Sequence, residues 1–249
     1  MGQLGLANGP FGLKLPAMAQ LRVDVWSDIA CPWCYVGKRR LERALQEFPH
    51  EVDVVWHSFE LDPAAPKARD TSVSHAERIA QKYGISTAQA EKNSGRLCET
   101  ARGEGLSFDF EHIRSGNTFD AHRLIHLGRA RGVQNAVKER LLKAYLEEGA
   151  LMSDHATLVR LGVEAGLDEG EAADVLASDQ FADEVRADEA QARELGINGV
   201  PCFVLDGRFA VSGAQPPAVL LSALHQAFAE REPEPPAFAE GAVCGPDGC

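Results

Sequence analysis

The chain has 249 residues, of which 45% are hydrophobic and 25% charged, and its formal net charge at pH 7 is −12. These values predict a soluble globular protein, built as one large domain or as one domain with a sizeable insertion. The negative balance argues against non-specific binding of nucleic acid or anionic membranes, since phosphate contacts need clustered Lys and Arg. Six cysteines are too few for a disulfide scaffold in a chain of this length, so paired cysteines indicate metal or redox chemistry.

The first 20 residues read MGQLGLANGPFGLKLPAMAQ. The stretch AMA is similar to a signal-peptide cleavage site, but no Lys or Arg precedes the apolar part, and Gly and Pro interrupt it. No apolar run elsewhere approaches the length of a membrane span. We therefore interpret residues 1–20 as a disordered extension, with Met18 as a candidate true start, and expect a cytoplasmic protein that does not bind membranes.

A β-α-β unit is predicted close to the N-terminus. Residues 21–27, LRVDVWS, alternate apolar and polar side chains and are typical of a strand. A helix is expected from about Pro32, where Leu41 and Leu45 begin a helical repeat. Residues 51–59, EVDVVWHSF, indicate a second strand, so the two strands should be parallel with the helix crossing over between them.

The pattern is helical from about residue 72 to residue 195, although the short stretch 106–110, LSFDF, could be extended. Strand character then returns in PCFVLDG and RFAVSGA. These two runs flank Asp206 and Gly207, the strongest short signal for a β-hairpin. A last helix is expected over residues 216–230.

These elements predict an α/β protein with a mixed sheet flanked by helices. The sheet domain should comprise residues 21–62 and 196–230, and residues 63–195 should form a large all-helical insertion domain. The remaining segment, residues 231–249, is rich in Pro and Gly and should be an irregular, flexible tail.

A pair of cysteines, Cys31-Pro32-Trp33-Cys34, follows the first predicted strand and opens the first helix. Two intervening residues in a first helical turn bring the sulfurs within bonding reach, and the free N–H groups and helix dipole there favour a thiolate on the first cysteine. A thiolate is the nucleophile of thiol–disulfide exchange. We therefore expect Cys31 to attack and Cys34, which should be more buried and less ionised, to resolve.

The same spacing occurs in zinc half-sites and in structural disulfides. A structural zinc site needs four ligands, and no clear second ligand pair lies at a suitable distance. His122 and His126 have i, i+4 spacing, but their segment is more simply a helix face. A structural disulfide between these two cysteines would close a very short loop and so would restrict the unfolded chain very little. A redox dithiol without a metal is therefore favoured.

A second signal is GINGVPCFV, residues 196–204. An X-Pro bond just before a strand is a candidate for the cis isomer, although only a few per cent of such bonds are cis. A cis bond between Val200 and Pro201 would leave the Val200 backbone groups free to pair with an extended substrate segment.

Taken together, the CPWC turn, WHSFELDP, NTFDAHRLIHLGRARG and GINGVPCFV resemble the DsbA family of thioredoxin-fold proteins. Within it, the chain is similar to the FrnE branch, which is related to 2-hydroxychromene-2-carboxylate isomerases and kappa-class glutathione transferases. The resemblance implies a thioredoxin fold with a helical insertion over the active site. It also implies thiol–disulfide oxidoreductase activity, with Cys31 as nucleophile, Cys34 as resolving thiol and Pro201 as the cis-proline.

The related isomerases and transferases typically have a serine in place of the first cysteine and use glutathione. This chain keeps both cysteines, which favours disulfide exchange. Periplasmic DsbA relatives carry a signal peptide and a His inside the motif, and this chain shows neither, which argues against a strongly oxidising periplasmic role.

Five further residues are candidates near the site. Cys202 follows Pro201 and could trap a mixed disulfide, but a small buried residue is the simpler interpretation. Asn117 and His122 match the family segment and could line the cleft, or Asn117 could cap the following helix. Glu60 could accept a proton from Cys34, although an exposed carboxylate is the commoner outcome. Cys98 is interpreted as a core thiol.

The function that follows is a thiol–disulfide oxidoreductase or disulfide isomerase acting on protein thiols and disulfides. It should need no tightly bound cofactor, and thioredoxin or glutathione could supply electrons. One alternative is a glutathione-dependent isomerase or transferase acting on a small molecule. Another is a non-enzymatic protein that binds a metal or senses redox state through its cysteine pairs.

The chain ends on a second cysteine pair, in VCGPDGC. The four residues between Cys244 and Cys249 have strong turn chemistry, so a local disulfide is geometrically feasible. Two hypotheses stay open. The mobile tail could exchange electrons between the first cysteine pair and an outside partner, or its two cysteines could be a local disulfide or idle thiols.

Overall fold

The computed structural model describes residues 20–69 and 72–231. In this part of the chain the strands are β1 (Leu21–Ser27), β2 (Val52–Ser58), β3 (Cys202–Leu205) and β4 (Phe209–Ser212). The helices are α1 (Pro32–Glu47), α2 (His75–Tyr83), α3 (Thr87–Gly103), α4 (Phe119–Ala130), α5 (Gln134–Leu146), α6 (His155–Glu164), α7 (Glu169–Ala177), α8 (Ala182–Glu194) and α9 (Pro217–Ala229).

The four strands form one mixed sheet in the order β2-β1-β3-β4. Strand β1 is parallel to β2 and antiparallel to β3, so the predicted crossover through α1 is confirmed. Strands β3 and β4 form an antiparallel hairpin, in which Asp206 and Gly207 both have positive φ, as a tight primed turn requires. The sheet thus joins the two ends of the described chain, with Trp26 of β1 opposite Cys202 of β3.

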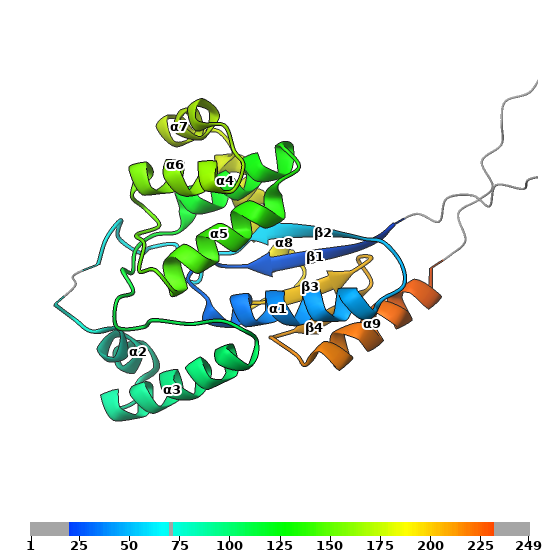
Figure 1. The fold of residues 1–249 in the computed structure, drawn as a ribbon, viewed down its shortest axis with the longest axis horizontal. Helices are drawn as coiled ribbons and strands as arrows, with labels where there is room; N and C mark the ends of the chain where they lie inside the picture. The colour runs from blue at the N-terminus through cyan, green and yellow to red at the C-terminus, as the bar shows by residue number, and fades with distance from the viewer. Residues whose placement is uncertain (1–19, 70–71, 232–249) are drawn as a thin grey trace, which may run out of the picture.

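Helices α1 and α9 pack side by side against the sheet (Figure 1). Pro32 occupies the first turn of α1, where its missing N–H costs no hydrogen bond. Leu41 and Ala44 lie on the buried face of α1, while α9 buries Leu220 and Leu224. The strand–turn–helix that carries the cysteine pair is therefore held on its inner side by a continuous apolar surface.

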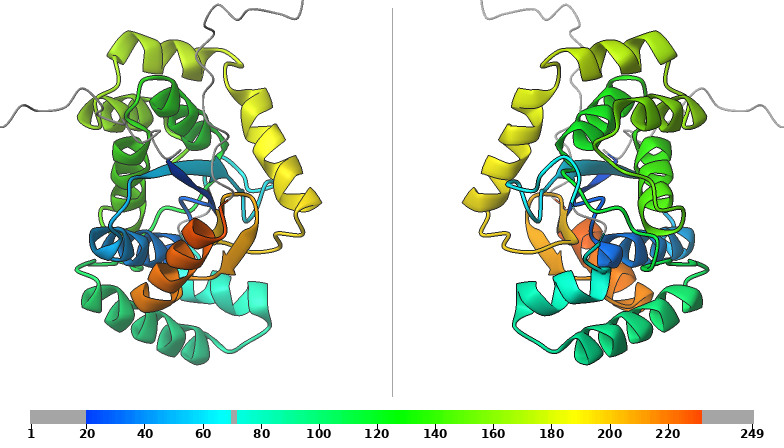
Figure 2. Two further views of the ribbon diagram at one scale, coloured as in Figure 1. Left: turned by 90° about the vertical axis from the view of Figure 1, so that its right-hand side faces the viewer. Right: turned by 90° about the vertical axis from the view of Figure 1, so that its left-hand side faces the viewer.

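The helical segment between β2 and β3 divides into two groups, which lie on opposite sides of the sheet (Figure 2). Helices α2 and α3 pack against each other, and a capping box between Ser74 and Glu77 fixes the start of α2. Helices α4 to α7 form the second group, and α8 runs along β2.

Polar contacts attach α5 and α8 to the sheet. On α5, the Gln134 side chain accepts from the Trp56 backbone N–H (3.1 Å) and donates to the Trp56 carbonyl (2.8 Å). Both backbone groups of Trp56 on the edge strand β2 thus have a hydrogen-bond partner. On α8, Asp188 accepts from the Ser58 N–H at 2.8 Å, and its carbonyl accepts from Trp26 Nε1 at 3.0 Å. These contacts hold α5 and α8 against β2.

Residues 106–110 form no strand, contrary to the extended segment considered from the sequence. The Asp109 N–H donates to the Leu146 carbonyl at the end of α5, and Phe108 packs at the edge of the apolar core. The apolar alternation of this stretch therefore reflects a connection packed against helices rather than a strand with a pairing partner.

Candidate active site: a buried dithiol behind a cationic cleft

Cys31 and Cys34 lie where β1 passes into α1. Cys31 is the N-cap of α1, and the Cys34 N–H donates to its carbonyl at 3.0 Å. Both thiols are free. Cys31 is 5% exposed and Cys34 is 0% exposed, whereas Trp33 between them is 42% exposed. An incoming substrate can therefore reach Cys31 and not Cys34.

The loop before β3 faces this turn. The peptide bond between Val200 and Pro201 is cis, and the Val200 carbonyl oxygen lies 3.6 Å from Cys31 Sγ. Pro201 also packs tightly on α1, because a Cβ added at Gly37 would lie 2.9 Å from Pro201 Cγ. The glycine at position 37 thus allows the loop to approach the first cysteine.

Three buried polar groups lie behind the dithiol: Asp28, His122 and Lys138. Asp28 accepts from the Leu61 N–H at 2.8 Å and from the Ala30 N–H at 3.2 Å, and its Oδ1 lies 3.4 Å from His122 Nε2. Burial alone would raise the pKa of Asp28, but its bonds to His122 and to backbone N–H groups hold that pKa below its ordinary value. Burial lowers the pKa of His122, so the imidazole is neutral and Asp28 carries a negative charge.

The surroundings act differently on the two thiols. The hydrogen bond to Cys34, burial and nearby negative charge raise the pKa of Cys31 well above its ordinary value. Burial opposes ionisation of Cys34 too, but the hydrogen bond from Cys31 and the positive charge of Lys138 lower the pKa of Cys34. The expectation of a Cys31 thiolate was based on the end of the helix alone, and Lys138 is a further cation that acts on the pair from more than a hundred residues away in sequence.

A cleft of about 1200 Å³ opens in front of Cys31. One wall is the dithiol turn, including Pro32 and Trp33. Helices α2 and α3 and the connections beside them form the other wall, which includes Arg69, His75, Arg78, Lys82, Arg96 and Phe110. Four Lys or Arg side chains line the cleft against two carboxylates, Asp28 and Asp62, although the chain as a whole is strongly acidic.

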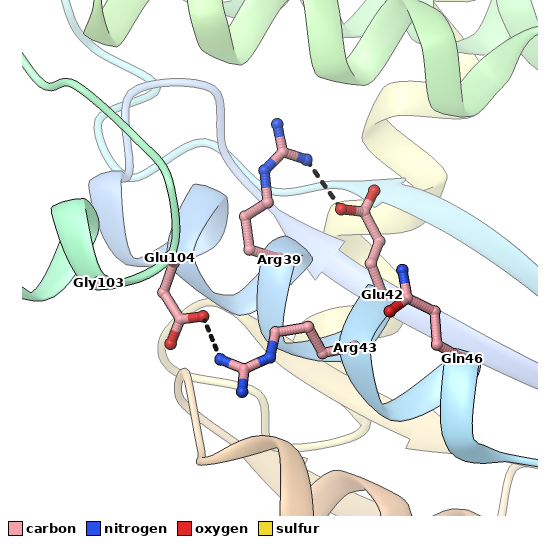
Figure 3. A pocket seen from close by; sticks show the side chains of 6 residues that line it. All are labelled: Arg39, Glu42, Arg43, Gln46, Gly103 and Glu104. Atoms are coloured by element: carbon pink, nitrogen blue, oxygen red, sulfur yellow. Dashed lines mark hydrogen bonds and ion pairs between the residues drawn. The ribbon is translucent and has the colours of Figure 1, made fainter.

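A smaller pocket of about 420 Å³ lies on the outer face of α1 (Figure 3). Its charged side chains pair with one another: Arg39 with Glu42 at 2.8 Å, and Arg43 with Glu104 at 3.0 Å. The adjacent Lys38 is buried and pairs with Glu42 and Glu139. Short-range ion pairs therefore neutralise the basic run at residues 38–40, and this pocket holds no nucleophile.

Two of the predicted cleft residues lie behind the cleft rather than on its surface. His122 is fully buried against Asp28. The Asn117 carbonyl accepts from the Phe119 N–H at 2.9 Å and so supports the start of α4, while its amide donates to Glu60 at 3.1 Å. Asn117 thus supports the turn that leads into α4, whose N-cap is Thr118.

The other candidate cysteines are packing residues in this structure. Cys202 is 5% exposed in a small apolar cluster with Trp26, Ile197 and Val204, and burial raises the pKa of its thiol. Cys98 on α3 is half-buried, and burial likewise raises its pKa. Cys244 and Cys249 lie outside the described residues, as do residues 1–19.

Glu60 is not the exposed carboxylate that the sequence suggested as the commoner outcome. Its side chain is fully buried, and its Oε2 lies 2.7 Å from Arg186 on α8. Burial raises the pKa of Glu60 to about 7, even though Arg186 lowers it. Glu60 thus belongs to a charge cluster with Arg186 and Glu189 that joins the end of β2 to α8.

Sequence reasoning missed Asp28, Lys138 and the cationic wall. One signal for Lys138 was available: Gln134, Lys138, Leu141 and Tyr145 share one face of α5, and Gln134 and Lys138 are the two polar positions on this otherwise apolar face. A lysine on the core face of a helix is seldom buried without a role.

Two further searches concern only the described part of the chain. Over residues 20–69 and 72–231, no group of three or more His, Cys, Asp or Glu side chains is arranged to hold a metal ion. Among the helices of these same segments, none is long and apolar enough to cross a membrane.

Comparison with known proteins gives a consistent result. Residues 22–225 match the model of the DSBA-like thioredoxin domain. A probable DsbA oxidoreductase from Streptomyces coelicolor is 45% identical, with 92% of this chain and 98% of that chain covered and a TM-score of 0.81.

Two more distant structures share the fold. A 2-hydroxychromene-2-carboxylate isomerase has 17% identity and a TM-score of 0.63, covering 82% of this chain and 95% of its own. The cytosolic disulfide reductase DsbM from Pseudomonas aeruginosa, solved with GSH, has 18% identity and a TM-score of 0.55, covering 84% of this chain and 96% of its own. The mixed sheet, the dithiol at the start of α1 and the family match over most of the chain agree, and the chain belongs to the family of DsbA-like thioredoxin domains.

Proposed function

We propose that this protein is a thiol–disulfide oxidoreductase, or disulfide isomerase, of the FrnE type that acts on protein thiols and disulfides through Cys31 and Cys34. One observation carries the proposal: two free thiols lie in one helical turn, the first at the floor of a large open cleft and the second fully enclosed behind it. This is the arrangement that two-step exchange needs, because the attacking sulfur must be reachable and the resolving sulfur must be shielded from other partners.

The exchange would proceed in two steps. The proton shared by the two sulfurs moves to Cys34, and the Cys31 thiolate attacks one sulfur of the substrate disulfide. A Cys31–substrate bond forms and the other substrate sulfur leaves as a thiolate. Cys34 then gives its proton to the first substrate thiolate and attacks Cys31 Sγ, the Cys31–Cys34 bond forms, and the second substrate sulfur is released as a thiolate that takes a proton from water. The substrate gains two electrons and the dithiol loses two, and the reverse sequence oxidises a substrate dithiol.

The walls of the cleft suggest how a polypeptide would bind. The Val200 carbonyl beside Cys31 can accept a hydrogen bond from an extended segment. Arg78, Lys82 and Arg96 on the opposite wall favour acidic side chains near the reacting sulfur. Exposed Trp33 adds an apolar contact at the rim.

The proposal is tested by Cys31→Ser and Cys34→Ser variants in insulin reduction and in refolding of scrambled ribonuclease. Cys31→Ser should abolish both activities, and Cys34→Ser should accumulate mixed disulfides. Cys98→Ser is the matched control, since Cys98 lies on α3 and is not among the residues that line the cleft, and it should retain full activity. Full activity of Cys31→Ser would falsify the proposal.

A second candidate function is a glutathione-dependent isomerase or transferase acting on a small molecule. The cationic wall is the observation that favours it, because glutathione is an anionic tripeptide, and one structural neighbour was solved with GSH. Glutathione-dependent turnover that survives Cys34→Ser, without activity on protein disulfides, would support this alternative.

We place the activity in the cytoplasm, with glutathione or thioredoxin as the electron donor. A neighbour of the same fold is described as a cytosolic disulfide reductase. Cell fractionation with detection of the native protein tests the location. The rates at which glutathione and thioredoxin reduce the disulfide form of the protein identify the electron donor.

The pair Cys244/Cys249 is proposed as a second redox pair on the strength of the sequence alone. If the tail pair exchanges electrons with Cys31–Cys34, replacing both Cys244 and Cys249 by Ser should slow the re-oxidation and the turnover of the protein. Unchanged rates would leave the tail without a redox role.

A further inference from the structure

Helix α8, drawn in yellow in Figure 2, leads into the loop that faces the dithiol. The helix ends at Glu194, and the chain then passes through Val200 and the cis-proline to the start of β3. The Val200 carbonyl oxygen lies 3.6 Å from Cys31 Sγ. The place of α8 on the sheet therefore sets where this loop begins.

Asp188, in the second half of α8, makes polar contacts with both neighbouring strands of the sheet. On β2, its Oδ2 accepts from the Ser58 N–H at 2.8 Å and its Oδ1 lies 2.6 Å from His57 Nδ1. On β1, the Trp26 indole N–H donates to its backbone carbonyl at 3.0 Å. From α4, His126 Nε2 lies 3.0 Å from Oδ2. This one buried residue thus joins α8 to β1, β2 and α4.

The contacts of His57 require a proton on each of its ring nitrogens. Nδ1 lies 2.6 Å from Asp188 Oδ1, and Nε2 lies 2.6 Å from Asp24 Oδ1. An ionised carboxylate can only accept hydrogen bonds, and further donors stabilise both carboxylates as anions: Arg22 on Asp24 at 2.6 Å, and the Ser58 N–H on Asp188. Burial opposes a charge on His57, but its bonds to the two carboxylates raise its pKa above the ordinary value. The ring is therefore an imidazolium between β1 and α8.

This polar cluster lies directly beside the apolar surface on which the loop packs. The His57 ring stacks on Trp26, with 4.5 Å between the ring centres and 14° between the planes. Trp26 in turn belongs to the small apolar cluster that includes Ile197 and Cys202, and Val200 packs against this cluster. The side chain that supports the loop is thus held by the same groups that attach α8.

Building on the proposed function, we infer that Asp188 is a positioning residue for substrate binding: with the His57 imidazolium it fixes α8 on the sheet and so holds the Val200 carbonyl where an extended substrate segment pairs with it. The role concerns the binding of a polypeptide and not the reactivity of the sulfur. Asp24 differs from Asp188, because it lies on β1, its side chain is 14% exposed and it keeps Arg22 as a partner. The attachment of α8 therefore depends on Asp188 and not on Asp24.

The first test compares a large and a small substrate in Asp188→Asn, which keeps the size of the side chain and removes its charge. The KM for a disulfide-bonded peptide should rise about three- to tenfold, the value of one hydrogen bond to the displaced Val200 carbonyl. Reduction of hydroxyethyl disulfide, which is too small to span from Cys31 to that carbonyl, should stay within about twofold of the wild type. A general loss of structure would lower both activities together. Asp24→Asn is the matched control and should change neither, and an unchanged peptide KM in Asp188→Asn, or an equal rise in both variants, overturns the inference.

The second test needs no turnover, because Cys202 is a built-in reporter of the cluster under the loop. It is 5% exposed beside Pro201, whereas Cys98 on α3 is half-buried and serves as the internal reference. Alkylation of each cysteine is followed by peptide mass spectrometry in the full chain. Asp188→Asn should speed alkylation of Cys202 about tenfold by favouring local opening, with Cys98 unchanged. Equal alkylation of Cys202 in the variant and the wild type would contradict the inference.

A third measurement uses the unaltered protein and so can contradict the inference even if Asp188→Asn fails to fold. In ¹⁵N-labelled protein, His57 should show two ring N–H signals at neutral pH and about one unit above it, although histidine ordinarily loses a proton near about 6.5. A single ring N–H at neutral pH would overturn the inference. Because neither alkylation nor these signals need a substrate, an inactive protein with the expected Cys202 and His57 results would remove the proposed function and leave the role of Asp188 in placing the loop standing.

Discussion

Helices α2 and α3 and helices α4 and α5 belong to one inserted segment, yet they surround the dithiol in different ways. The first pair is largely exposed and presents Arg78, Lys82 and Arg96 to an open cleft. The second pair is mostly buried, and its His122 and Lys138 side chains are enclosed behind the dithiol. Substitutions in α2 and α3 can change what the site binds at little cost in stability, whereas substitutions in α4 and α5 are constrained by the core.

The largest effect expected from this difference is on stability. Leu141 on α5 is completely buried within the main apolar cluster, so Leu141→Ala should lower the free energy of unfolding by about 2–5 kcal/mol. Tyr83→Ala at the end of α2 should change it by less than about 0.5 kcal/mol, because the Tyr83 ring is 65% exposed. Urea denaturation of the two variants checks this prediction. Equal losses in the free energy of unfolding would mean that α2 is packed as tightly as α5.

A smaller effect is expected where α1 meets the loop before β3. Gly37→Ala places a Cβ 2.9 Å from Pro201 Cγ and 3.2 Å from Phe203 Cζ, so the loop must move. We expect a loss of about 1–3 kcal/mol in stability, together with slower exchange, because the Val200 carbonyl is displaced from Cys31. Gly95→Ala on α3 is the matched control. Its new Cβ meets nothing within 4 Å, so it should be neutral or stabilise by up to about 1 kcal/mol. If the rate of thiol–disulfide exchange were unchanged in Gly37→Ala, the position of the loop before β3 would not matter for catalysis.

The smallest effect concerns the cationic wall. Arg96→Glu should raise the KM for an acidic disulfide peptide a few-fold at low salt, with kcat unchanged, and the difference should shrink as salt screens the charge. Arg193→Glu makes the same change in net charge at an exposed position on α8 that does not line the cleft, and it should leave KM unchanged. If both variants behaved alike, the effect would belong to the net charge and not to the wall.

Much of this fold is encoded locally and could be predicted. The alternation in residues 21–27, the Pro at the start of α1 and the Asp206-Gly207 turn each determine a nearby element, and the predicted sheet follows from them. Residues 106–110 show the limit, since their apolar pattern is used for packing against α5 and not for pairing.

The site divides in the same way. Cys31 and Cys34 are recognisable because their chemistry depends on a spacing of three residues within one helical turn. The burial of Lys138 was not predictable, because it results from the packing of α5 on β2. The buried Glu60 was missed for the same reason, since Arg186 reaches it only after α8 has packed along the sheet.

The adjacency of β1 and β3 has a consequence for how the protein is made. The cysteines leave the ribosome early, while their neighbours Lys138 and Pro201 are translated much later. At about 5–20 residues per second, the interval between Cys34 and Pro201 lasts roughly 10–30 s. During that time the nascent chain carries two thiols without the cleft or the loop that surround them in the finished protein. The surroundings of the dithiol are therefore complete only near the end of synthesis.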